Sequence, residues 1–217
     1  MNRKFFLPPF LIYFLYLINF IIFIIFSFST FLFFALLTGF VFFLFRKHKF
    51  IYRDRIKRNE NIYISPVNGT IERITKNVEI DSEKYTEVII LVSFFHEWGL
   101  YLPMSCEVDQ KIESKGMRLF RFGEYPKKLE DWSHKKHNFI QIRSKEQKTS
   151  LINIYPCLTG LKPQIWPISG DRGLSAACFG ILPLGGVVQV FLPEQSNLFI
   201  EEGDLLHAGD TVMANLQ

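Results

Sequence analysis

A run of 41 residues without one charged side chain occupies the start of this chain. It extends from Phe5 to Phe45, with Arg3-Lys4 before it and Arg46-Lys47 after it. A bilayer core of about 30 Å is crossed by roughly 20 helical residues, so the run is about twice as long as one span requires. We therefore expect the first 45 residues to be a membrane anchor, a helical hairpin that spans twice or dips in and returns.

Basic residues at both ends of this run favour the same topology. The positive-inside rule places both ends on the cytoplasmic side, which a hairpin satisfies and a single span does not. Ser27, Ser29 and Thr30 form the predicted turn between the two halves. A cleavable signal peptide would have an apolar region of only about 7–15 residues, so we predict that the anchor is retained. Asn19 is its one strongly polar side chain, a candidate contact with other transmembrane helices.

A basic segment follows the anchor and is the predicted linker, residues 46–62. Seven Lys or Arg residues lie between positions 46 and 58, against the single Asp54. Next to a membrane such a cluster attracts anionic headgroups at about 1 kcal/mol per basic residue. The net charge of the whole chain is only +4, with no basic stripe paired to a nucleic-acid motif, so no nucleic-acid partner is expected.

Residues 63–217 predict a single β domain. Short apolar runs alternate with Pro and Gly, as strands and turns do, and no window keeps a helical period. A mainly antiparallel β domain is therefore expected. Residues 115–137 have few apolar positions and are expected to lie over the domain or against the membrane. The predicted strands are 63–64, 69–74, 88–94, 100–102, 106–113, 139–144, 150–155, 185–192, 198–200 and 211–214.

Residues with redox or metal-binding chemistry are few. Cys106, Cys157 and Cys178 are odd in number and contain no CxxC pair, which predicts buried thiols in a reducing cytoplasm. His134 and His137 have an HxxH spacing, but no third or fourth ligand is near, so no metal site is expected.

Two segments resemble the halves of an internal quasi-repeat. The first is SPVNGTI at residues 65–71, and the second is EGDLLHAGDTV at residues 202–212. The second is a turn, strand and turn typical of barrel-sandwich domains such as biotinyl and lipoyl carriers. No Lys stands at the hairpin tip to carry a swinging cofactor, so the signal concerns the fold alone.

The order of the motifs resembles the short bacterial and archaeal form of the phosphatidylserine decarboxylase family. Five segments carry the resemblance in order: a YRDR junction, SPVNG, a segment from Ser93 to Cys106, FGILPLGGVVQVFLP and AGDTV. The resemblance implies a mainly β, barrel-sandwich-like decarboxylase fold behind an N-terminal α-helical transmembrane hairpin. It also implies a place in phospholipid metabolism at the bacterial inner membrane, with the β domain on the cytoplasmic side.

The family's chemistry is made by the chain itself. A serine attacks the carbonyl of the preceding glycine, and elimination leaves a pyruvoyl group on the new N-terminus. That group forms a Schiff base with the serine headgroup and accepts electrons while CO₂ leaves. An Asp–His pair activates the serine, as in a hydrolase triad.

None of these three residues is present at the matching positions. The serine falls on Gly186, the aspartate on Asn68 and the histidine on Trp98. Glycine has no hydroxyl group, so no pyruvoyl group and no other cofactor are expected, and no catalytic residue is assigned. A headgroup pocket formed by Asn68, His96, Trp98, Gly185 and Gly186 remains a prediction.

Three functions stay open at this point. The leading hypothesis is a membrane-bound pseudoenzyme that contacts membrane phospholipids, with an active paralogue or other membrane subunits as partners. The second is an active phospholipid decarboxylase, a carboxy-lyase with unorthodox residues. A relocated nucleophile, Ser175 or Cys178 with His96 as the base, lies eight to eleven residues from the expected position and is disfavoured. The third is a structural or interaction subunit of a membrane assembly.

Overall fold

The computed structural model describes residues 9–25, 28–44, 61–114, 137–157 and 162–216. It divides into two compact units, Met1–Lys49 and Phe50–Gln217. The first unit contains two helices, α1 (Pro9–Ile25) and α2 (Phe28–Leu44). Residues 46–60 of the predicted basic linker and residues 115–136 of the predicted excursion lie outside the described residues.

The two helices pack against each other as an antiparallel hairpin. The Asn19 side-chain amide donates to the Thr38 hydroxyl at 2.7 Å and to the Leu15 carbonyl at 2.9 Å. Aromatic pairs lie on either side of this bond, Tyr16 with Phe42 and Phe23 with Phe31, with ring centroids 5.8 and 5.0 Å apart. The pair of packed helices is as predicted, but Ser29 and Thr30 of the predicted turn lie within α2. The Asn19 amide, a candidate for contacts outside the pair, donates within it.

Each of the two helices has 17 residues. At about 1.5 Å per residue, such a helix rises about 25 Å, less than the roughly 30 Å of a bilayer core. None of the helices in the described part of the chain is long and apolar enough to cross a membrane. The transmembrane part of the prediction is therefore not confirmed.

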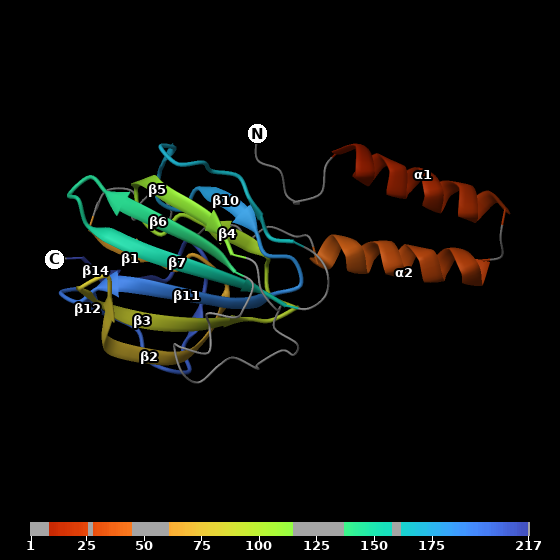
Figure 1. The fold of residues 1–217 in the computed structure, drawn as a ribbon. Helices are drawn as coiled ribbons and strands as arrows, with labels where there is room; N and C mark the ends of the chain where they lie inside the picture. The colour runs from red at the N-terminus through yellow and green to blue at the C-terminus, as the bar shows by residue number, and fades with distance from the viewer. Residues whose placement is uncertain (1–8, 26–27, 45–60, 115–136, 158–161, 217) are drawn as a thin grey trace. The chain divides into compact units, whose positions relative to one another are not determined.

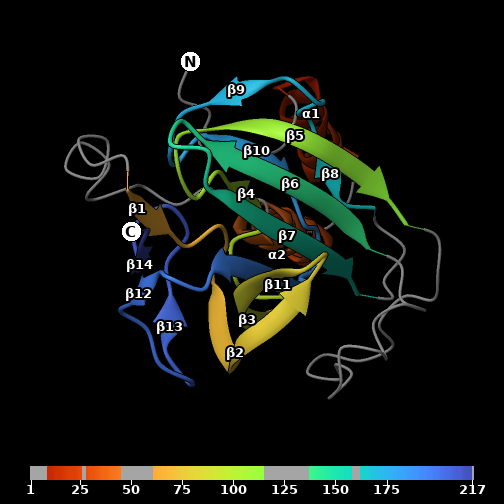
Figure 2. The same cartoon turned by 60° about the vertical axis from the view of Figure 1, so that its left-hand side comes forward.

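The second unit is built from antiparallel strands, as predicted (Figures 1 and 2). Its largest sheet has eight strands in the order β13-β2-β3-β11-β7-β6-β5-β9, and two smaller sheets have the orders β1-β14-β12 and β4-β10-β8. The strands are β1 (Ile62–Ile64), β2 (Gly69–Ile80), β3 (Glu83–Val92), β4 (Gly99–Tyr101), β5 (Cys106–Glu113), β6 (Asn138–Ser144), β7 (Thr149–Pro156), β8 (Gln164–Ile165), β9 (Arg172–Gly173), β10 (Cys178–Ile181), β11 (Gly186–Pro193), β12 (Asn197–Leu198), β13 (Leu205–Leu206) and β14 (Val212–Asn215).

The main hydrophobic core combines one face of the large sheet with residues of both small sheets. Side chains alternate between the two faces of a strand, so Val188, Val190 and Leu192 of β11 enter this core. Tyr63 of β1 and Phe179 of β10 belong to the same buried cluster. The other face of β11 is buried as well, where Val187 and Phe191 belong to two smaller hydrophobic clusters.

The large sheet has the same strand arrangement when it is followed from either edge. β13, β2, β3 and β11 on one side correspond to β9, β5, β6 and β7 on the other. The turns before β9 and β13 agree in detail, because Gly170 and Gly203 both have φ of +92°. In each turn an aspartate accepts a backbone N–H three residues earlier, Asp171 at 2.9 Å and Asp204 at 2.8 Å. The β domain thus contains two halves related by an approximate two-fold axis.

The predicted quasi-repeat concerns a different pair of segments and stays a prediction. Residues 65–71 and 202–212 meet in the sheet, where Gly69 pairs with Leu206 and Thr70 with Leu205. The counterpart of β2 is β5, and the counterpart of β13 is β9.

Candidate functional site

The structure brings the three motif positions together at the end of β3. Gly186 pairs with Val92 on one side of β3, and Thr70 pairs with Leu91 on the other side. The second pairing places Asn68, two residues before Thr70, beside the same end. The carbonyl of Trp98 accepts the N–H of Leu182 at 2.7 Å, just before the turn into β11.

The backbone at Gly186 has no room for a side chain. Its φ is +154°, and a Cβ placed there would lie 2.2 Å from the carbonyl oxygen of Tyr155 on β7. Gly185 is equally confined, since its Cβ would lie 2.1 Å from the carbonyl oxygen of Val92. Both contacts are to backbone atoms, which cannot rotate away. A serine, the residue from which the family forms its pyruvoyl group, does not fit this conformation at position 186.

Asn68 uses both ends of its amide. Its Oδ1 accepts the N–H of Ala208 at 3.0 Å, and its Nδ2 donates to Glu97 at 3.2 Å. Glu97 also accepts the hydroxyl of Tyr101 at 2.5 Å. An aspartate could accept from Ala208 but could not donate to the carboxylate of Glu97. The amide at position 68 is therefore matched to its neighbour.

Glu97 is the buried charge of this site. Its side chain is buried with Asn68 and Tyr101, and its two oxygens receive one bond from each of them. Burial and the nearby Glu97 carboxylate both raise the pKa of Tyr101, so its hydroxyl stays protonated as the donor. The motif comparison missed Glu97 because it lies between the positions that match the family's Asp and His. Its only sequence signal was an acidic residue in an otherwise apolar run.

Trp98 and His96 are held by their own loop. The Trp98 indole is 2% exposed, its N–H donates to the carbonyl of Phe94 at 3.0 Å, and it contacts the Phe94 ring edge-on. His96 is half-buried, and its Nδ1 accepts the N–H of Ser93 at 3.3 Å. The predicted headgroup pocket stays a prediction; cavities of about 620, 530 and 270 Å³ in the described part of the chain are lined by other residues.

A second buried polar network lies on the face of the large sheet opposite the main core. Gln189 on β11 donates to Glu87 on β3, and its oxygen accepts from Asn153 at 2.9 Å and Tyr155 at 3.2 Å. Arg73 pairs with Glu87 at 3.4 Å. Burial and the Glu87 carboxylate raise the pKa of Tyr155. These side chains contact one another across four strands, which indicates a structural role.

The candidate metal ligands and cysteines are not gathered at this site. His134 lies outside the described residues, while His137 stacks on Tyr155 with ring centroids 5.1 Å apart. Cys106 and Cys157 are buried thiols and Cys178 is half-buried. Burial and the nearby Asp109 raise the pKa of Cys106 to about 12, so this thiol is neutral at physiological pH.

Known proteins similar to this chain include several phosphatidylserine decarboxylase proenzymes. The chain is similar to the phosphatidylserine decarboxylase proenzyme of Wolbachia pipientis wMel, at 27% identity over 77% of this chain and 74% of the relative. The enzyme of Saccharopolyspora erythraea is 23% identical over 84% and 75%, and that of Symbiobacterium thermophilum is 21% identical over 84% and 83%. No family profile and no solved structure matches the chain. The chain is therefore a distant relative of the phosphatidylserine decarboxylase family.

Proposed function

We propose that this chain is a membrane-anchored, phosphatidylserine decarboxylase-like protein of phospholipid metabolism that does not process itself and carries no pyruvoyl group. The observation that carries the proposal is the lack of space at Gly186, where a Cβ would lie 2.2 Å from a backbone oxygen. The position has lost its hydroxyl group and its backbone conformation also excludes a side chain. On this proposal the chain is a pseudoenzyme with the decarboxylase scaffold.

The neighbouring residues support the same proposal. A nucleophilic hydroxyl needs a positioned base, but Trp98 has none and its indole N–H is bonded to Phe94. Asn68 has no charge with which to orient a histidine, and it donates to Glu97 instead. The hydrogen bonds that replace the activating pair are structural.

The anchor part of the proposal rests on the helical hairpin. Fifteen of the large apolar side chains in α1 and α2 are exposed, which is costly in water at about 25 cal/mol per Å². A hairpin of two 17-residue helices would enter the bilayer from the cytoplasmic side and return without a full crossing. Release of the full chain from membranes by an alkaline carbonate wash would contradict this anchor.

The proposal is tested with carbonyl reagents on the purified full chain. A pyruvoyl group reacts with hydroxylamine or is reduced by borohydride, and either change shifts the mass of the peptide that carries it. We expect no adduct at any peptide, whereas a phosphatidylserine decarboxylase that has matured from its proenzyme serves as the positive control. An adduct on this chain would overturn the proposal.

A further inference from the structure

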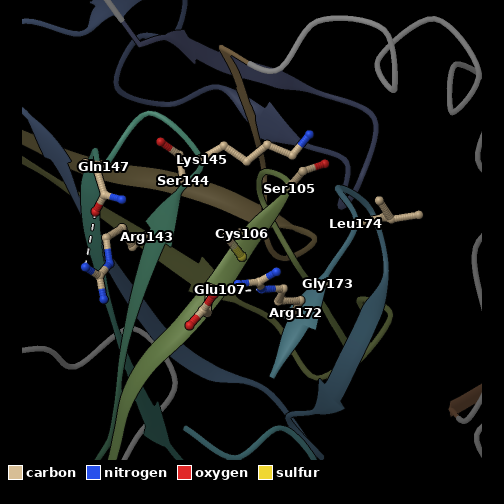
Figure 3. Close-up of a pocket in the computed structure, with 10 residues that line it drawn as sticks. All are labelled: Ser105, Cys106, Glu107, Arg143, Ser144, Lys145, Gln147, Arg172, Gly173 and Leu174. Carbon is tan, nitrogen blue, oxygen red and sulfur yellow. Dashed lines mark hydrogen bonds and ion pairs between the residues drawn. The ribbon is translucent and has the colours of Figure 1, made fainter. Parts of the chain in front are cut away.

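A cavity of about 620 Å³ opens where β5, β6 and β9 meet, and Figure 3 shows the side chains that line it. Its volume is within the range of about 300–1,000 Å³ usual for small-molecule sites. Cys106 and Leu174 supply apolar surface to its wall. All of its lining residues belong to the β domain, at the end of the sheet opposite Gly186.

Positive charge exceeds negative charge around this cavity. Arg143, Lys145 and Arg172 line it, and Glu107 is the one carboxylate among the lining residues. The Arg143 guanidinium is already paired with Asp109, which leaves Lys145 and Arg172 as the cations of the cavity. Glu107 accepts only the Nε of Arg172, at 2.8 Å, which leaves the two terminal nitrogens of that guanidinium without a partner in the described residues. The Cys106 thiol adds no negative charge, because its pKa is raised to about 12.

The neutral polar groups at the cavity are also donors. The Oγ of Ser105 accepts the N–H of Ser175 at 3.2 Å, and the Oγ of Ser144 accepts two backbone N–H groups at 3.2 Å. Each hydroxyl therefore retains its own proton for a ligand. The side-chain oxygen of Gln147 accepts from Arg143 at 3.1 Å, so the NH₂ group of Gln147 is the end that can donate to a ligand.

The approximate two-fold axis relates this cavity to the candidate site at Asn68. Cys106 pairs with Gly173 as Gly69 pairs with Leu206. Ser105 accepts the N–H of Ser175 just as Asn68 accepts that of Ala208. The same backbone arrangement thus holds the buried Asn68–Glu97 pair in one half and lines a cavity with basic side chains in the other half.

We propose that this cavity binds the phosphate group of an anionic ligand. Its donors are the Arg172 guanidinium, the Lys145 ammonium, two serine hydroxyls and the Gln147 amide, and phosphate accepts hydrogen bonds from such groups at every oxygen. The apolar wall at Leu174 and Cys106 is suited to carbon next to the phosphate, as in a phospholipid headgroup region. The source is either a lipid phosphate or free phosphate.

The test is calorimetric titration of the full-length protein in a nonionic detergent. The two probes are inorganic phosphate and short-chain dihexanoylphosphatidic acid. Arg172→Gln is the principal variant, because it removes a cation from the rim and can still donate to Glu107. Lys162→Gln is the matched control, since Lys162 is also exposed and pairs with a glutamate of β5, Glu113 at 2.9 Å, but does not line the cavity.

We expect Arg172→Gln to weaken phosphate binding by about tenfold, the loss of one charged contact, and Lys162→Gln to change it less than about twofold. Adding Lys145→Gln to Arg172→Gln should weaken binding further. If the lipid probe binds at least about tenfold more tightly than inorganic phosphate, the natural source is a lipid; equal affinity indicates free phosphate. The proposal is overturned if neither probe binds below about 10 mM, or if the Arg172 and Lys162 variants weaken binding equally.

Discussion

The carbonyl oxygen of Tyr155 lies 2.2 Å from the point where a Cβ on Gly186 would stand. Carbon and oxygen atoms that are not bonded approach no closer than about 3 Å without strain, so β7 and β11 are packed around a glycine. A side chain at the position that matches the family's nucleophile would therefore meet backbone atoms. We expect that a single reverse mutation to serine does not restore self-processing.

Gly186→Ser is expected to leave the chain uncleaved and to lower its free energy of unfolding by about 2 kcal/mol or more, because the new side chain meets backbone atoms. Chemical denaturation measures the loss. Gly203→Ser is the matched control, since its Cβ would meet nothing within 4 Å. Self-cleavage of the Gly186 variant, or a loss no larger than that of the control, would contradict the steric account.

Asn68→Asp should destabilise the protein by about 2–4 kcal/mol at pH 7, because it removes a donor and sets a second carboxylate beside the buried Glu97. Like charge raises the pKa of one carboxyl. The penalty should therefore shrink as pH falls towards 4–5, where that group is protonated and donates again.

The exchange of both groups provides the control for this prediction. The double variant Asn68→Asp/Glu97→Gln again places one amide donor opposite one carboxylate, and it should lie within about 1 kcal/mol of the wild type. Denaturation of the wild type, both single variants and the double variant gives the coupling free energy. Additive losses would show that the two side chains do not act as a pair.

Stability should fall in alkaline solution. The pKa values of Tyr63, Tyr101, Tyr155 and Cys106 are all raised, chiefly by burial. Above their unfolded pKa values the unfolded chain binds fewer protons than the native chain, so the free energy of unfolding falls as pH rises. Tyr63→Phe removes one such group and should reduce the slope above pH 10 by about 1.4 kcal/mol per pH unit. An unchanged slope would contradict the burial of that hydroxyl.

The two equivalent turns should respond equally to the same substitution. Gly170 and Gly203 both have φ of +92°, and a Cβ at either position would meet nothing within 4 Å. Gly170→Ala and Gly203→Ala should each cost about 1–2 kcal/mol, the penalty for an L residue in the left-handed region. Thermal or chemical unfolding measures both. Losses that differ by more than about 1 kcal/mol would contradict the equivalence of the two halves.

Sequence patterns predicted the parts of this fold that alternate or repeat locally. β3, β7 and β11 alternate core residues along each strand, and the apolar run between Phe5 and Phe45 predicted the helical pair. β8, β9 and β13, each of two residues, were missed, and so was the four-residue β10. They are defined by long-range partners rather than by their own pattern, so no local signal marks them.

Only part of the candidate site could be predicted, because some of its contacts also depend on long-range partners. Asn68, Trp98 and Gly186 were identified by matching motifs, and strand register brings them to one end of β3. The bond between Asn68 and Glu97 depends on how residues 93–98 fold back, which no spacing in the sequence reveals. The cavity beside Arg172 was missed because its donors come from three strands and the turn at Gln147.

The most direct test of the account is the intact mass of the purified full-length protein under denaturing conditions. The proposal that Gly186 cannot form a pyruvoyl group predicts one uncleaved chain of 25.5 kDa. Two fragments that meet between Gly185 and Gly186 would contradict it, because they would show that the chain processes itself at the position where a serine is absent.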